Sequence, residues 1–267
     1  MLKFTRKPYK VGLVLSGGGA RGFAHAGALL ALEEVGIKAD VIAGVSAGSV
    51  VTAMYAAGMS PEEIVAAFGD AKFGDFAELG VPRDGFFSMD GFKKFLKKHI
   101  PYEKIEDLPT PALICATDLD HNKPVAFAEG NIFDCVAASC SIPIVFKPVR
   151  IHGVTYVDGG VLANLPAWAL RDSCKYLIGI NCSPVPHRGQ PKSIMDIAHR
   201  TYDLLVKNNS QPQMELCDLA VSIDDIASYK VFNLKEIRRV FRSGYDSTLS
   251  ALLDAGFTHH GTRRKKP

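Results

Sequence analysis

Short apolar runs alternate along this chain with longer segments of helical periodicity. The apolar runs lie at 10–16, 40–43, 112–117, 125–128, 154–157, 175–181 and 219–223, lengths typical of buried strands. Helical segments are expected at about 22–35, 49–57, 89–99, 132–138, 193–208 and 233–255. Strands that alternate with helices favour a mostly parallel sheet with helices on both faces. The pattern predicts a three-layer α/β/α fold, without indicating the strand order.

Local signals mark several helix boundaries. Gly36 and Gly58 follow helical segments and are expected to end them. The run Ser60-Pro61-Glu62-Glu63 combines an N-cap serine, a proline at the first helical position and a capping-box glutamate, so it predicts a helix start. Residues 70–88 are rich in glycine and phenylalanine and predict a surface excursion.

The composition predicts one cytoplasmic domain without bound metal. The chain has 267 residues, of which 47% are hydrophobic, enough for a single large core. No apolar run approaches the ~18 residues that span a bilayer, and Val11–Leu15 is too short for a signal-peptide core. The six cysteines form no C-x-x-C pair, and most lie in apolar segments, as buried reduced thiols do.

Basic residues gather at both ends of the chain. They are Lys3, Arg6, Lys7 and Lys10 at the front and Arg263, Arg264, Lys265 and Lys266 at the back. The rest of the chain has 23 basic and 28 acidic residues. The ends are either solvated tails or a fringe for peripheral contact with anionic membranes, at about 1 kcal/mol per charge. No aromatic interleaving or known motif indicates nucleic-acid binding.

A G-x-S-x-G motif at Gly44-Val45-Ser46-Ala47-Gly48 supplies a candidate nucleophile, Ser46. Such a motif places its serine on a sharp turn between a strand and a helix, where side chains at the glycine positions would clash. Here the motif follows a predicted strand and precedes a predicted helix. That setting favours a catalytic elbow over a tight structural turn.

A second motif, Gly17-Gly18-Gly19-Ala20-Arg21-Gly22, lies between the first predicted strand and helix. It also fits a dinucleotide fingerprint, which expects an acidic residue at the end of the second strand. The elbow occupies that place, and a G-K-[ST] sequence is missing. We therefore expect Gly17, Gly18 and Gly19 to offer amides to an oxyanion, with Gly22 in support. Arg21 would either add charge to that hole or cap a nearby carbonyl.

The base that activates Ser46 is less evident. The histidines are His25, His99, His121, His152, His187, His199, His259 and His260. None follows a strand in a loop that would aim it at Ser46, as an α/β-hydrolase requires. Asp158 does end a predicted strand, and Gly159 and Gly160 after it permit close approach. We expect this aspartate at the same carboxyl edge as the serine, although Asp-Gly pairs are also common turns.

Together these motifs resemble those of the patatin-like phospholipases. That family combines a glycine-rich oxyanion loop, a G-x-S-x-G elbow and a D-G-[GA] motif, and the order here is the same. Ala138-Ser139-Cys140-Ser141-Ile142-Pro143 is similar to a further A-S-x-x-x-P segment of the family. One departure is Ser16, where plant members have aspartate; many bacterial-type members look like this chain.

The resemblance implies a serine acyl hydrolase of fatty-acyl esters, with a Ser46–Asp158 dyad, an acyl-enzyme intermediate and no metal or cofactor. It covers residues 10–172 as the catalytic core. Residues 173–267 carry no assignable motif and are expected to complete the same domain. Burial should raise the pKa of Asp158 above its ordinary value of about 3.9, since a normal aspartate is a poor base.

Substrate access and two rival functions stay open. Phe73, Phe76, Phe86, Phe87 and Met89, with the basic helix at 92–98, would either form an acyl-binding flap at a membrane or pack ordinarily on the core. One rival function is a histidine-triad esterase. The other is a non-catalytic lipid-binding or scaffold protein of the same fold. The sequence does not indicate the head group or the oligomeric state.

Overall fold

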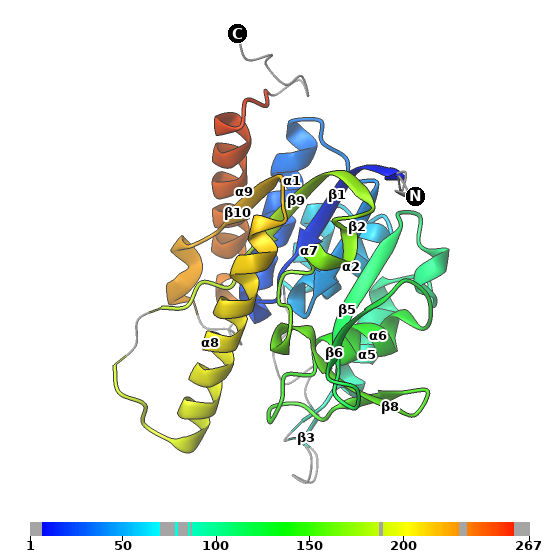
Figure 1. The fold of residues 1–267 in the computed structure, drawn as a ribbon, viewed down its shortest axis with the longest axis vertical. Coiled ribbons are helices and arrows are strands. Elements are labelled where there is room, and N and C mark those ends of the chain that lie inside the picture. Colours follow the sequence, from blue (N-terminus) through cyan, green and yellow to red (C-terminus); the bar gives the residue numbers. More distant parts are fainter. Residues whose placement is uncertain are drawn as a thin grey trace, which may run out of the picture.

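A sheet of eight strands forms the middle layer of the described part of the chain (Figure 1). The computed structural model describes residues 7–69, 78–79, 85, 87–186, 189–229 and 234–258. The strands are β1 (Tyr9–Leu15), β2 (Val41–Val45), β5 (Ala112–Asp118), β6 (Lys123–Phe127), β7 (Val149–Ile151), β8 (Val154–Asp158), β9 (Cys174–Asn181) and β10 (Leu219–Ser222). Their order is β10-β9-β1-β2-β5-β8-β7, and β6 also pairs with β5. Strands β3 (Glu78–Leu79) and β4 (Phe87–Ser88) form a separate small pair.

The sheet is mixed, with its parallel and antiparallel strands on different sides. Strands β10, β9, β1, β2 and β5 are parallel, whereas β6 and β8 run antiparallel to β5, and β7 runs antiparallel to β8. The prediction of a mostly parallel sheet is confirmed. Its antiparallel part follows from short connections, because a parallel crossover needs a dozen or more residues. Only His152 and Gly153, both at positive φ, join β7 to β8.

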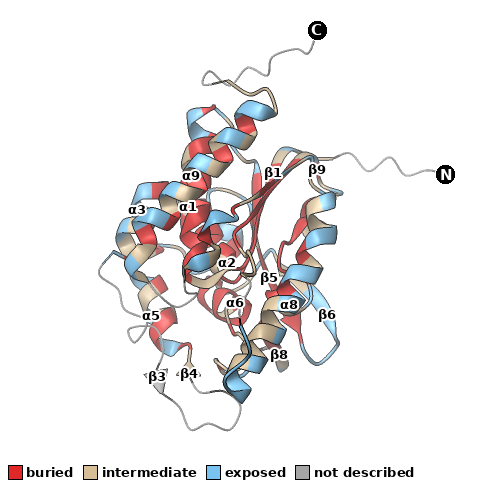
Figure 2. Ribbon diagram, turned by 90° about the vertical axis from the view of Figure 1, so that its left-hand side faces the viewer, coloured by how far each residue is buried: buried red, intermediate tan, exposed pale blue. Residues whose placement is uncertain are grey.

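Helices cover both faces of the sheet (Figure 2). On one face lie α1 (Phe23–Glu34), α2 (Ala47–Ala56), α3 (Pro61–Ala67), α5 (Asp90–His99), α6 (Ile132–Ser139) and α9 (Ile237–Asp254). On the other lie α7 (Ala167–Leu170) and α8 (Ile194–Glu215). Short 3₁₀ turns add η1 (Gly19–Gly22), η2 (Ile105–Asp107), η3 (Gly159–Val161), η4 (Asp225–Ser228) and η5 (Leu234–Glu236). The predicted three-layer fold is confirmed.

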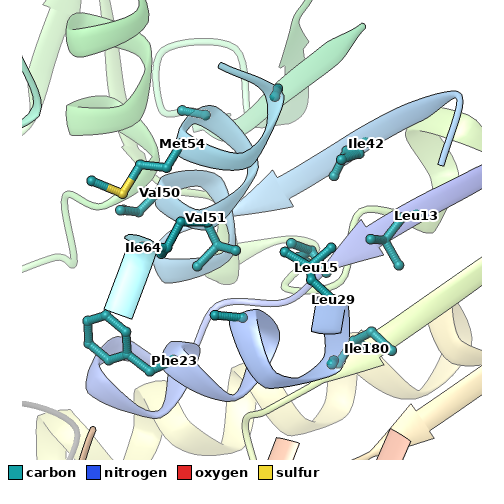
Figure 3. Close-up of a cluster of buried hydrophobic side chains, with 14 of the residues drawn as sticks. Leu13, Leu15, Phe23, Leu29, Ile42, Val50, Val51, Met54, Ile64 and Ile180 are labelled. Carbon is teal, nitrogen blue, oxygen red and sulfur yellow. The ribbon is translucent and has the colours of Figure 1, made fainter. Parts of the chain in front are cut away.

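Alternation along β1 divides the core between the two faces. Leu13 and Leu15 point into the large cluster beneath α1 and α2, which Figure 3 shows in part. Val14, between them, belongs to a smaller cluster with Leu165 and Leu170 around α7. Side chains of a strand point alternately to opposite faces, so a strand covered on both sides is apolar throughout. This explains why the run of apolar residues in β1 shows no alternation with polar residues.

The predicted helix boundaries are mostly met. Ser60 and Glu63 form the expected capping box, and Gly36 and Gly58 have positive φ where their helices end. Helix α8 is longer than predicted, since it continues from residue 208 to Glu215 and includes Pro212. Asn208, Asn209, Ser210 and Pro212 are poor helix formers, so packing rather than propensity maintains the helix there.

The proposed flap lies partly outside the described residues, which omit Phe73, Phe76 and Phe86. In the described part, Met89, Phe92 and Leu96 are buried in the large core. Helix α5 thus packs on the core through these side chains, and its Lys93 pairs with Asp134 at 2.8 Å. None of the described helices combines the length and apolar character that crossing a membrane would need.

Candidate active site

Ser46 stands on the sharp turn between β2 and α2 that the motif predicts. Its backbone has φ 52° and ψ −124°, a conformation that typically costs about 1–3 kcal/mol outside glycine. A β-carbon at Gly48 would lie 2.4 Å from the Leu15 oxygen, and one at Gly44 would lie 2.3 Å from the Gly48 oxygen. Only glycine fits these two positions, because α2 passes directly against the ends of β1 and β2.

The end of α6 and the residues directly after it brace both the nucleophile and the aspartate. The Ser139 hydroxyl accepts a hydrogen bond from Ser46 N at 2.8 Å and donates to Cys115 O at 2.6 Å. Two residues later, Ser141 O accepts from Asp158 N at 2.9 Å. These serines belong to the segment that resembles A-S-x-x-x-P, so that segment ties the two motifs together.

Asp158 reaches Ser46 along an antiparallel strand. Strand β8 ends at Asp158, which lies opposite Ala116 of β5. The preceding residue of β5, Cys115, lies opposite Val45, directly before Ser46. The aspartate is thus brought to the serine across β5, near the carboxyl end of that strand as expected, but β8 runs antiparallel to β5, which was not expected. The cause is the tight turn between β7 and β8, which reverses the chain.

Burial dominates the electrostatics of Asp158. The residue is inaccessible to solvent, and its Oδ1 accepts a hydrogen bond from Gly160 N at 2.7 Å. Burial raises the pKa of the carboxyl to about 6, against the hydrogen-bonding influence of the Ser46 hydroxyl, the Gly160 N–H and the Tyr202 hydroxyl. No described residue makes a hydrogen bond of ordinary geometry to Oδ2. The Gly160 N–H thus fixes one of the two carboxylate oxygens.

The glycine loop lies against the nucleophile. A β-carbon at Gly17 would be 3.2 Å from the Ser46 β-carbon. The Gly17 N–H, however, donates to Asn164 O at 3.1 Å. The N–H groups of Gly18 and Gly19 enter none of the hydrogen bonds described for the loop. Of the three expected oxyanion donors, Gly18 and Gly19 are therefore the available ones.

Arg21 caps carbonyls rather than adding free charge. Its guanidinium donates to Pro184 O at 2.7 Å and to Tyr229 O at 2.9 Å, and the residue is 4% exposed. Both carbonyls belong to loops beside the cavity that contains Ser46. Of the two roles expected for Arg21, its contacts favour the structural one.

Two of the described histidines lie close enough to the site to be considered as its base, the buried His25 and the cavity-lining His199. His25 is fully buried, with Nε2 2.7 Å from Ser16 O, and burial lowers its pKa to about 4, so its ring is neutral. His199 lines the same cavity as Ser46, and its Nδ1 lies 3.3 Å from Asp203. No described hydrogen bond joins a histidine to Ser46. His187, His259 and His260 lie outside the described residues.

The profile of the family described as patatin-like phospholipase matches residues 13–171, more than half of the chain. The chain belongs to this family. The resemblance drawn from the motifs is thereby confirmed. The match ends before β9 and α8, so the family profile covers the elbow, the glycine loop and Asp158 but not the helix that lies over them.

Curated relatives of this patatin-like chain are much longer proteins. Lysophospholipase nte1 of Aspergillus fumigatus is 34% identical over 164 residues, which cover 58% of this chain and 11% of that protein. An uncharacterised NTE family protein of Mycobacterium bovis is 32% identical over 162 residues, covering 59% and 27%. The chain thus spans a minor part of the length of these relatives.

Among solved structures, VipD from Legionella pneumophila has the same fold. It superposes with a TM-score of 0.52 at 14% sequence identity, and the match covers 92% of this patatin-like chain and 67% of VipD. At this identity the likeness shows the fold alone.

Helix α8 brings residues to the site that the motifs did not reveal. Asn209 Nδ2 donates to Gly160 O at 2.8 Å, and Asn209 Oδ1 accepts from Asn164 N at 2.9 Å. Tyr202 lines the Ser46 cavity. Tyr202 and Asn209 are seven residues apart, two turns on one helix face, with the buried Val206 between them. Polar residues at that spacing on the inner face were the signal that could have found them.

Two cavities of different character meet at Ser46. The larger has a volume of about 1040 Å³ and polar as well as apolar walls, including Asn164, His199 and Tyr202. The smaller has about 130 Å³. Ser46 and Gly19 line both. Among the described residues there is no group of three or more side chains suited to hold a metal ion.

Proposed function

We propose that this chain is a serine acyl hydrolase that cleaves fatty-acyl esters of phospholipids or lysophospholipids. The observation that carries the proposal is the pairing of Ser46 on its strained elbow with a solvent-inaccessible Asp158 whose pKa is raised to about 6. A base near that value is mostly ionised at neutral pH and still holds a proton well. Perturbed carboxyls of this kind are typical of catalytic sites.

The chemistry we propose proceeds in two acyl-transfer steps. The Ser46 hydroxyl attacks the ester carbonyl carbon while Asp158 takes its proton, and the N–H groups of Gly18 and Gly19 stabilise the oxyanion. The tetrahedral intermediate collapses, the C–O bond breaks, and the leaving alcohol receives the proton from Asp158. Water then attacks the acyl-enzyme, with the same carboxylate as base. The fatty acid leaves, and the Ser46 hydroxyl is restored.

The substrate class rests on the family and on the walls of the site. The curated relatives of fungal origin are named lysophospholipases, and apolar side chains such as Ile144, Met195 and Leu205 line the larger cavity while remaining partly exposed. Apolar surface at the mouth of a site suits peripheral contact with a lipid surface. We include such contact in the proposal.

A substrate panel with the purified chain tests this function. We expect fatty acid release from lysophosphatidylcholine, phosphatidylcholine or p-nitrophenyl esters, measured by mass spectrometry or absorbance. Ser46→Ala should reduce the rate at least ~10³-fold. Because the change only removes a hydroxyl, circular dichroism should show an intact fold. Lipid binding without hydrolysis of any member of the panel would instead favour a non-catalytic lipid-binding protein.

A further inference from the structure

The smaller cavity beside Ser46 has walls suited to a hydrocarbon chain. It is lined by Phe23 of α1, Val50 and Val51 of α2, Phe68 after α3, Phe92 of α5 and Phe146. Among its described lining residues, the polar side chains are Ser46 and the Cys140 thiol. Burial raises the pKa of Cys140 well above its ordinary value, so the thiol is uncharged. This cavity offers an acyl chain apolar contact and offers a head group no charge partner.

The larger cavity has a mixed wall, in which polar groups stand among apolar side chains. Asp196 and Asp203 contribute carboxylates to its wall, and Asn164, Ser183 and Tyr202 contribute neutral polar groups. Polar groups in this wall can form hydrogen bonds with the hydroxyls of a polar alcohol, and among the described residues the smaller cavity has only Ser46 and the Cys140 thiol to offer. The two cavities share Ser46, Gly19 and Ile142, so both reach the nucleophile.

We propose that the acyl chain of the substrate occupies the smaller cavity and the leaving alcohol the larger one. This proposal rests on the acyl hydrolase function above and adds the orientation of the ester at Ser46. The wall of the acyl cavity belongs to the core that Figure 3 shows, where Phe23, Val50 and Val51 come from the two helices that begin at the glycine loop and the elbow. Helices α1 and α2 would thus both position the catalytic loops and limit the length of the acyl chain.

Opposite changes at Val50 test this orientation. We expect Val50→Phe to lower the ratio of kcat/KM for p-nitrophenyl decanoate over p-nitrophenyl acetate at least about tenfold, the usual effect of a methylene-sized mismatch in an apolar pocket. Val50→Ala should raise the same ratio, and it provides the readout if the larger side chain prevents folding. Leu205→Phe in the larger cavity is the matched control, and it should leave the ratio unchanged.

The outcomes separate this proposal from the function on which it rests. If the wild-type chain hydrolyses neither ester, the acyl hydrolase function itself fails. If it hydrolyses both, and folded Val50 variants keep the wild-type ratio, the orientation is wrong. A ratio that responds to Leu205→Phe but not to Val50 changes would place the acyl chain in the larger cavity.

A second inference comes from the hydroxyl of Tyr202, which α8 places beside the base. A β-carbon built on Gly160 would lie 2.5 Å from the Tyr202 hydroxyl oxygen and 3.1 Å from Asp158 Oδ1. The hydroxyl and the carboxylate therefore flank the same small gap, in a buried region where Asp158 Oδ2 has no hydrogen bond of ordinary geometry from a described residue. We infer that Tyr202 is a positioning residue that holds the Asp158 carboxylate by donating to it.

The surrounding charges agree with a donating tyrosine. Burial and the neighbouring Asp158 raise the pKa of Tyr202 well above its ordinary value, so the hydroxyl keeps its proton. Cys140 and Asp203 are the other titratable groups that act on it, and both oppose its ionisation. The Tyr202 hydroxyl in turn lowers the pKa of Asp158, against the stronger effect of burial.

Tyr202→Phe tests this role because it removes the hydroxyl and keeps the ring. Without the donor the pKa of Asp158 should rise, so the acidic limb of the kcat/KM profile should move to higher pH. We expect kcat to fall about tenfold. Tyr245→Phe is the matched control, since it removes a hydroxyl bound to Glu34 far from the site, at 2.7 Å. A Tyr202→Phe protein with the wild-type kcat and an unmoved acidic limb would overturn the assignment.

Discussion

The chain up to residue 171 and the part that follows contribute differently to the site. The first part carries the three motifs and matches the family profile, and its residues Ser46, Asp158, Gly18 and Gly19 are those to which we assign chemistry. The second part carries no motif, yet α8 packs over the site and binds the loop after Asp158 through Asn209. A short motif can be recognised because the reaction requires particular residues at a fixed spacing in the sequence. A supporting helix needs only the right side chain on the right face.

The largest effect should follow from a change in the first part. Asp158→Asn keeps the shape of the side chain and can keep the hydrogen bond from Gly160, but the amide cannot take a proton. We expect ester hydrolysis to fall at least ~10³-fold. The fold should survive, because a neutral amide avoids the cost of burying an ionised carboxylate. Activity near the wild-type level in a folded variant would remove Asp158 from the mechanism.

A smaller loss is expected at the oxyanion loop. A β-carbon at Gly18 would lie 2.6 Å from Cys182 Sγ, so Gly18→Ala should shift the loop and misdirect its N–H. We expect kcat to fall roughly 10²-fold, the usual cost of losing one oxyanion donor. Stopped assays on a soluble ester measure this directly. Cys182→Ala in the same background makes space and should restore part of kcat if the clash is the cause.

In the second part, Asn209→Ala should weaken the attachment of α8. The change removes a donor to Gly160 O and an acceptor for Asn164 N. We expect a loss of about 1–3 kcal/mol in the free energy of unfolding, the cost of leaving such groups without partners, and a loss of activity of about tenfold. Urea unfolding and ester assays give the two quantities. An unaffected activity would mean that α8 acts only as cover for the sheet.

The smallest effect is expected for His199, and it decides the histidine-triad alternative. His199 lines the Ser46 cavity and pairs with Asp203, but no described hydrogen bond joins it to the serine. His199→Gln should therefore change kcat/KM by no more than about threefold. A loss as large as that of Asp158→Asn, in a folded protein, would make His199 the base.

Much of the fold follows from the sequence because apolar runs and caps are local signals. The capping box at Ser60 and the elbow at Ser46 are in place as predicted. The antiparallel course of β8 was not predicted, because its cause is a two-residue turn at His152 and Gly153 that has no strong sequence signature. Asp158 was therefore placed beside Ser46 without the antiparallel strand β8 that brings it there.

The residues of the candidate site were predictable only where they lie close together in the sequence, within one motif. Gly17 was expected to offer its N–H to an oxyanion, but that group is bound to Asn164, 147 positions later in the chain. Such a pairing depends on how the chain returns to the glycine loop, which periodicity does not encode. The helical spacing of Tyr202 and Asn209 is visible in the sequence, but that spacing does not say that Asp158 lies beneath this face of α8.

Covalent labelling of Ser46 by a fluorophosphonate, followed over pH, tests the proposed dyad most directly. Asp158 acts as a base only when ionised, and its pKa lies at about 6, so labelling should be fast above that pH and fall as the pH drops through it. Peptide mass spectrometry should find the label on Ser46. In Asp158→Asn the rate should be at least ~10²-fold lower and independent of pH in this range. Labelling of another residue, or the same pH dependence in Asp158→Asn, would contradict the account.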